Sequence, residues 1–148
     1  MKLYLRQTFR SIPPEYVVAD ESGTELYRAA GDRNRRRLLH IQTRAGEYVG
    51  TVDWDTQSNW KSCSVYIGKE KIGMIEEPPG EYRIGYRGWY ARTMHEDGLF
   101  FTVADSLGNI VADIRKNRKR PGFALSADVP DPRWSFDITI ILFALAAE

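Results

Sequence analysis

The chain ends in an apolar run, residues 138–147, within the stretch DITIILFALAAE. A run of this kind can be a membrane anchor, an exposed apolar tail or the middle of a folded core. It is about half as long as the roughly 20 residues that a helix needs to cross a bilayer, and apolar runs of this size are more typical of a buried helix. The run therefore favours a core element over an anchor and predicts no transmembrane segment.

The residues just before the run have the features of a helix start. Pro130 ends a strand, Asp131 suits the N-cap, and Pro132 suits the first helical position. Asp137 would lie in an early turn, where the helix dipole favours a carboxylate. The β-branched ITII segment also suits a strand, because periodicity alone cannot separate a buried helix from a buried strand. Length and capping favour a helix over residues 131–148, and its lack of a polar stripe requires enclosure on all sides.

Four segments of the chain share the pattern of a β-hairpin. Each places short apolar or alternating runs on both sides of a polar turn. In the first and last segments the turn begins with Asp20 or Asp105, which can bind the turn backbone. It ends with Gly23 or Gly108, which can take a positive φ. The turns recur at a spacing of roughly twenty residues, which indicates a hairpin array. The segments are 17–29, 38–52, 64–77 and 101–114.

Two further segments, 81–94 and 123–129, alternate in the manner of strands. A sheet with this many strands must deal with its unpaired edges, and it can do so by closing on itself. A closed sheet of this size needs its interior filled. The sequence therefore predicts a mainly β protein, a closed antiparallel β-barrel of repeated hairpins that encloses the hydrophobic C-terminal α-helix, with residues 1–148 as a single domain.

Composition and charge limit the compartment and the partners. The chain is 43% hydrophobic, which indicates a folded domain, and its net charge of +1 gives no general basic field for nucleic acid. The N-terminal sequence has no continuous apolar segment of the signal-peptide type, so we expect a cytoplasmic protein. The lone Cys63 excludes an internal disulfide and a thiolate metal cluster, and its alternation with Val65 and Ile67 predicts a core position.

No catalytic or cofactor-binding motif is present. The two histidines, His40 and His95, lack the spacing of metal ligands, so we expect neither a metal nor a cofactor. His40 should face away from its neighbours Leu39 and Ile41 on a strand. An enzymatic alternative would use His95 together with Glu96 or Asp97 in a small pocket at a barrel mouth.

Aromatic and glycine positions admit two interpretations each. The four tryptophans could form a platform for ligand stacking, although buried packing is their commoner role. The glycines of the GYRG and GWY sequences are interpreted as bends where the strands of the barrel coil. The tryptophans are Trp54, Trp60, Trp89 and Trp134.

Two basic clusters are the clearest candidate binding surfaces. One lies between the first and second hairpins, and the other follows the fourth hairpin. Several guanidinium groups near one point can hold phosphate in a bidentate manner, and basic residues near an anionic membrane each contribute about 1 kcal/mol. Solvated loops, or charges that protect strand edges, are the commoner role of such clusters, and nucleic acid is a less favoured partner than anionic lipid. The residues are Arg33, Arg35, Arg36 and Arg37 in the first cluster and Arg115, Lys116, Arg118, Lys119 and Arg120 in the second.

Several stretches resemble the LURP-one-related family of the tubby C-terminal-like superfamily. They are MKLYLRQTF at the start, DSLGNIVADIRK, GWYARTM, and FALSADV before the hydrophobic helix. The chain is similar to short free-standing bacterial members over nearly its full length. This resemblance implies a closed antiparallel barrel threaded by the C-terminal helix. The stretch DRNRRRLL is more basic than is typical of the family, and Trp134 and Phe136 near the helix start are a further departure.

The resemblance implies a binding role rather than a chemical one. Tubby itself binds phosphoinositide head groups through basic residues, and scramblase relatives are associated with membranes, although those ligand residues have no matching positions here. We expect a non-enzymatic binding or scaffold module that docks on anionic phospholipid head groups through its basic loops, peripheral to the membrane. The alternatives are a protein–protein interaction domain and the small-pocket enzyme, and the oligomeric state is left open.

Overall fold

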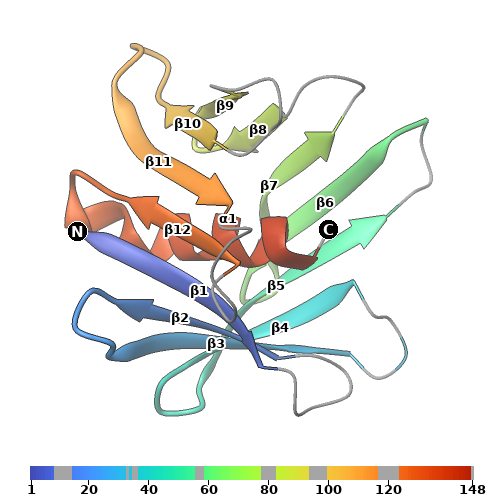
Figure 1. The fold of residues 1–148 in the computed structure, drawn as a ribbon. Coiled ribbons are helices and arrows are strands. Elements are labelled where there is room, and N and C mark those ends of the chain that lie inside the picture. The colour runs from blue at the N-terminus through green and yellow to red at the C-terminus, as the bar shows by residue number, and fades with distance from the viewer. Residues whose placement is uncertain are drawn as a thin grey trace.

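The chain forms one antiparallel sheet that curls into a barrel. The computed structural model describes residues 1–8, 15–32, 34, 37–55, 59–77, 83–93, 100–116 and 124–147. Within these residues twelve strands occur in the order β8-β7-β6-β5-β4-β3-β2-β1-β12-β11-β10-β9 (Figure 1). The strands are β1 Lys2–Thr8, β2 Glu15–Asp20, β3 Glu25–Gly31, β4 Leu38–Thr43, β5 Tyr48–Asp55, β6 Lys61–Ile67, β7 Glu70–Glu77, β8 Arg83–Tyr86, β9 Tyr90–Thr93, β10 Phe100–Ala104, β11 Ile110–Lys116 and β12 Leu125–Asp128.

The barrel is nearly closed, and β8 and β9 meet at the seam. Every ladder in the sheet is antiparallel, and the first strand, β1, pairs with the last, β12. β8 and β9 touch through the isolated bridge between Tyr86 and Trp89. The prediction of an antiparallel barrel of hairpins around a C-terminal helix is thereby confirmed, except that the barrel is nearly closed at this seam and not fully closed.

The hairpin turns form as the sequence predicts. The Asp20 carboxylate accepts hydrogen bonds from the backbone N–H groups of Ser22 and Thr24, both at 3.0 Å, and Gly23 has φ +85°. Asp105 repeats this arrangement before Gly108, whose φ is +84°. A local side-chain bond and a residue that tolerates positive φ therefore fix the turn.

The stretch 81–94 also supplies two strands, β8 and β9, as predicted. The interpretation of Gly88 as a barrel bend is wrong. Gly88 has φ +75° and Arg87 has φ +53°, so the two residues form a two-residue hairpin turn of the type that requires positive φ at both positions. Positive φ is unfavourable for a residue with a Cβ, and the geometry of the two-residue turn imposes it on Arg87.

The barrel has two ends with different connections. The odd-numbered strands begin at one end, and the tight hairpin turns after β2, β4, β6, β8 and β10 lie at that end. We call it the turn end. The opposite end, at which the odd-numbered strands finish, is the linker end. The segments between β3 and β4 and between β11 and β12 both start from the linker end.

The C-terminal segment is a helix inside the barrel, so the strand alternative is excluded. Asp131 caps a 3-10 turn, η1 (Pro132–Trp134), by accepting a hydrogen bond from the Arg133 N–H at 3.0 Å. The α-helix α1 (Ser135–Ala147) follows directly. The predicted N-cap is thus confirmed, although the first turn is 3-10, and Glu148 lies outside the described residues. In the part of the chain that the structure describes, no helix is long and apolar enough to cross a membrane.

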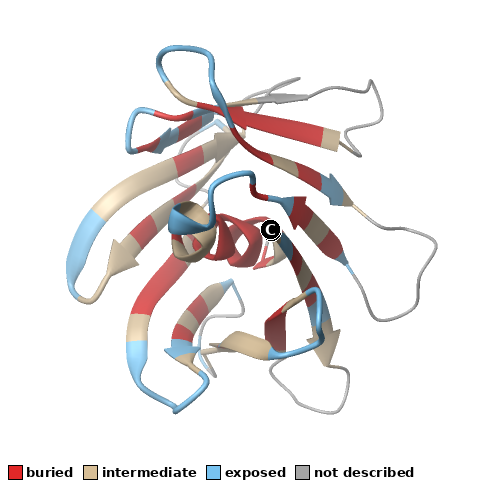
Figure 2. Cartoon of the chain, turned by 90° about the vertical axis from the view of Figure 1, so that its left-hand side faces the viewer, coloured by how far each residue is buried: buried red, intermediate tan, exposed pale blue. Residues whose placement is uncertain are grey.

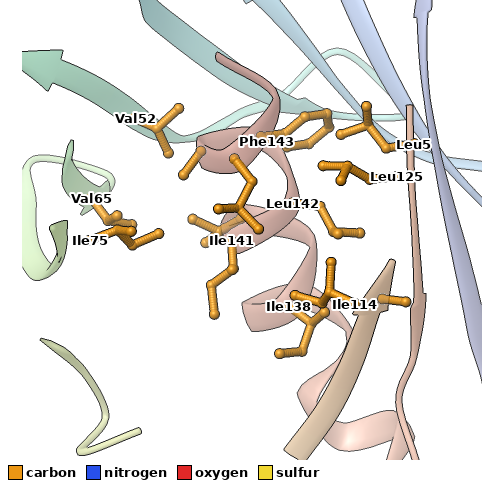
Figure 3. Close-up of a cluster of buried hydrophobic side chains, with 14 of the residues drawn as sticks. Leu5, Val52, Val65, Ile75, Ile114, Leu125, Ile138, Ile141, Leu142 and Phe143 are labelled. Carbon is orange, nitrogen blue, oxygen red and sulfur yellow. The ribbon is translucent and has the colours of Figure 1, made fainter. Parts of the chain in front are cut away.

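Helix α1 is buried over nearly its whole length (Figure 2). Its side chains leave in several directions and meet the inward-facing residues of different strands. Figure 3 shows Ile141 directed toward Val65 and Ile75, and Phe143 directed toward Leu5 and Leu125. A helix that is apolar on all sides is stable here because the wall surrounds it.

A side chain of the wall also caps the helix. The indole N–H of Trp54 on β5 donates a hydrogen bond to the Ala144 carbonyl at 2.6 Å. The last four carbonyls of a helix lack intrahelical partners, and burying one without a partner would be unfavourable. Trp54 therefore fixes how far α1 extends toward the linker end.

Candidate functional site: the basic side of the linker end

The strands that flank the two basic clusters finish or begin at the same end of the barrel. β3 and β12 are separated around the wall by only β2 and β1. β3 and β12 are therefore three strand spacings apart, which corresponds to about 14 Å around the wall. We call this half of the rim, from β4 round to β11, the basic side.

The base of the first cluster is built by backbone and side-chain contacts. The Asp32 N–H donates to the Leu38 carbonyl at 2.9 Å, and the Arg37 carbonyl accepts from the Trp54 N–H at 3.2 Å. The Asp32 carboxylate accepts from the Asn34 N–H at 2.8 Å and lies 3.2 Å from His40 Nε2. Arg37 is exposed on this fixed base, so its charge faces solvent.

The second cluster begins on β11 with cations on both faces of the wall. Arg115 points outward, with its guanidinium 4.9 Å from the centre of the Phe100 ring. Lys116 is the next residue on the strand, so it lies on the inner face, and its amine lies 5.5 Å from the centre of the buried Phe101 ring. Contacts of this kind position a cation over an aromatic face. The strand end therefore places one positive charge on the outer wall and one at the barrel mouth.

Most of the predicted site residues fall outside the described part of the chain. These residues are Arg33, Arg35, Arg36, Arg118, Lys119 and Arg120 of the basic clusters, and His95, Glu96 and Asp97 of the enzymatic alternative. In the sequence, residues 33–36 come between β3 and β4, residues 94–99 between β9 and β10, and residues 117–123 between β11 and β12.

Acidic residues also lie at the linker end. Asp53 and Asp55 lie near the end of β5, and Glu76 lies near the end of β7. The Glu76 carboxylate accepts a hydrogen bond from the Trp60 indole at 3.0 Å. Basic residues lie there too, with Lys61 at the start of β6 and Arg83 at the start of β8, so this part of the rim carries both signs of charge.

At the turn end, a polar cluster that the sequence did not predict holds the start of α1. Asp137 is buried; its carboxylate accepts hydrogen bonds from the Tyr86 hydroxyl and, at 3.1 Å, from Arg87 Nε. The Arg87 guanidinium also lies 5.5 Å from the centre of the Trp134 ring. Burial raises the pKa of Tyr86, and the adjacent Asp137 carboxylate raises it further. The only sequence signal was the carboxylate in the first turn, because its partners lie some fifty residues away.

The remaining candidate residues have structural roles. Cys63 is fully buried, and burial raises the pKa of its thiol to about 12, so it is a poor nucleophile near neutral pH. His40 lies on the outer face, as predicted. The tryptophans form no common platform: Trp54 and Trp89 are buried in the core, and Trp60 bonds Glu76. Among the described residues, no group of three or more His, Cys, Asp or Glu is placed to hold a metal ion.

Comparison with known proteins supports the fold. No family model matches the sequence, and a search of curated proteins finds no match. An X-ray structure of a protein from Arabidopsis thaliana superposes with a TM-score of 0.63 over 96% of this chain and 89% of that chain, at 10% sequence identity. At this level of identity the likeness shows the fold alone.

Proposed function

We propose that this protein is a non-enzymatic binding module that docks on anionic phospholipid surfaces through the basic side of the linker end. The observation that carries the proposal is the sheet order, because it brings the flanking strands of both basic clusters to one end of the barrel with only β2 and β1 between them. Arg37, Arg115 and Lys116 are the described members of this surface.

In this proposal the basic side faces the anionic surface, because both basic clusters lie at this end of the barrel. Each basic residue near an anionic membrane contributes about 1 kcal/mol, and this attraction falls off within a Debye length of about 10 Å at 0.1 M salt. Binding should therefore be strong only at low to moderate ionic strength.

We also infer kinship with the LURP-one-related family, with localisation in the cytoplasm and at the inner membrane surface. The order of the quoted stretches supports this kinship, and so does the nearly closed barrel around a buried C-terminal helix. A protein partner is the second candidate, but the described surface favours an anionic one.

Vesicle sedimentation tests the proposed function. The wild-type protein should bind vesicles that contain phosphatidylserine, should not bind pure phosphatidylcholine vesicles, and should dissociate as salt is raised. The triple variant Arg35→Glu, Arg36→Glu, Arg37→Glu should bind the acidic vesicles more than about 100-fold more weakly, since three contributions of about 1 kcal/mol are lost and three repulsive charges are added.

A double charge reversal at the turn end provides the control. Lys69→Glu with Lys71→Glu reverses exposed charges beside the turn between β6 and β7. It should bind acidic vesicles as the wild type does. Equal binding of the wild type to neutral and acidic vesicles, or equal weakening by both sets of reversals, would refute docking through the basic side.

A further inference from the structure

A groove of about 220 Å³ crosses the outer wall of the barrel over β1, β12, β11 and β10. It exists because Ser126 on β12 is small, whereas the residues in register with it, Tyr4 on β1 and Arg115 on β11, are large. Phe100 on β10 is in register with Arg115 and continues the aromatic border. A second row of side chains, two residues nearer the turn end, completes the groove.

This second row places two carboxylates directly opposite each other. Asp113 on β11 is in register with Asp128 on β12, and Lys2 on β1 follows Asp128 on the other side. The Asp113 carboxylate accepts a hydrogen bond from the Thr102 hydroxyl at 3.0 Å. In the described part of the chain, no salt bridge reaches either carboxylate. Like charges directly opposite each other across a strand pair repel, so the groove holds two carboxylates that a further cation would stabilise.

The cation of Arg115 lies on the same face of β11, two residues beyond Asp113. This spacing corresponds to about 6.8 Å along the strand. The guanidinium is held over the Phe100 ring at 4.9 Å, which fixes its position beside the groove. The groove thus offers a negative site and a positive site at a set separation, with aromatic rings at its borders.

We propose that this groove binds a small zwitterion, with the ligand ammonium group between Asp113 and Asp128 and the ligand carboxylate or phosphate on Arg115. The ammonium group relieves the repulsion between the two carboxylates. Tyr4 and Phe100 cover the carbon chain that joins the two charges. Lys2 competes with the ammonium group, because it approaches Asp128 from β1.

Calorimetric titration with unbranched ω-amino acids, from glycine to 6-aminohexanoate, tests the proposal. Affinity should rise with chain length until the two charges span the groove, and it should fall as salt is added. Asp128→Asn and Arg115→Gln should each weaken binding about 10- to 100-fold, as expected for the loss of a hydrogen bond to a charged group. Lys2→Gln should strengthen binding. Phosphoethanolamine, supplied free or as the head group of phosphatidylethanolamine vesicles, distinguishes a soluble ligand from a lipid.

Controls separate this site from the basic side of the linker end and from loss of folding. Asp128→Asn should leave the melting temperature close to that of the wild type, since it removes both the repulsion from Asp113 and the attraction of Lys2, and it should leave binding to acidic vesicles unchanged. Glu70→Gln on β7 should bind the zwitterions as the wild type does. Three results would each overturn the proposal: no saturable binding of any member of the series, wild-type affinity in Asp128→Asn, or equal binding of alkylamines that lack the anionic group.

Discussion

Replacing Phe143 with alanine should lower the free energy of unfolding by about 3–5 kcal/mol, the range measured for large aromatic truncations in cores. Phe143 is fully buried, and its ring packs toward Leu5 and Leu125 inside the barrel (Figure 3). The loss combines the transfer free energy of the ring with a cavity that the closed wall cannot fill by collapsing. Equilibrium urea denaturation, followed by tryptophan fluorescence, measures the change.

An exposed residue of similar character provides the matched control. Leu107 is 85% exposed in the turn between β10 and β11. Truncation of an exposed side chain generally changes stability by less than about 0.5 kcal/mol, so Leu107→Ala should unfold at nearly the wild-type urea concentration. If Phe143→Ala cost less than about 1 kcal/mol with an unchanged denaturant slope, α1 would not be a core element.

The second large effect is expected at Asp137. Asp137→Ala should destabilise the protein by about 2–4 kcal/mol, because it leaves the buried Tyr86 hydroxyl without its acceptor and removes the partner of Arg87. Arg87→Gln should cost less than about 1 kcal/mol, since the side chain is half exposed. A double-mutant cycle of Asp137→Ala with Tyr86→Phe should give a coupling energy above about 0.5 kcal/mol. Additive effects would show that the two side chains do not interact.

The same cluster predicts a loss of stability in alkali. Burial and the Asp137 carboxylate raise the pKa of Tyr86 above its ordinary value of 10.0. The contribution of neutral Tyr86 to the free energy of unfolding is therefore fully present below pH 10, where the phenol is neutral in both the folded and the unfolded chain. The contribution is lost as pH rises above 10, because only the unfolded chain ionises there. Burial also raises the pKa of the Cys63 thiol, from 9.0 to about 12, so Cys63 likewise lowers the free energy of unfolding as pH rises through this range. Tyr86→Phe should reduce the alkaline slope of the unfolding free energy.

Local chemistry explains why most of the fold could be predicted from the sequence. Asp20 and Gly23 determine their turn through contacts within five residues, and the cap at Asp131 is equally local. The helix follows from its length and its lack of a polar face. Gly88 was misinterpreted because a two-residue turn with Arg87 at positive φ is an uncommon sequence for that turn.

Contacts between distant residues explain what could not be predicted. Asp137 meets Tyr86 across 51 positions, and Trp54 meets Ala144 across 90, so no local pattern indicates either pair. The opposition of Asp113 and Asp128 depends on the register between β11 and β12. The placement of the two basic clusters at one end needed the sheet order, and in particular the pairing of β1 with β12.

Native-state hydrogen exchange of the backbone amides of 138–145, measured with increasing urea, tests most directly whether this segment fills the interior of the barrel. If it does, these amides should exchange only through global unfolding, with an opening free energy and a urea dependence equal to those of the whole protein. Rapid exchange without urea dependence, while the amides of β1 and β12 stay protected, would place the segment outside a barrel that is stable without it.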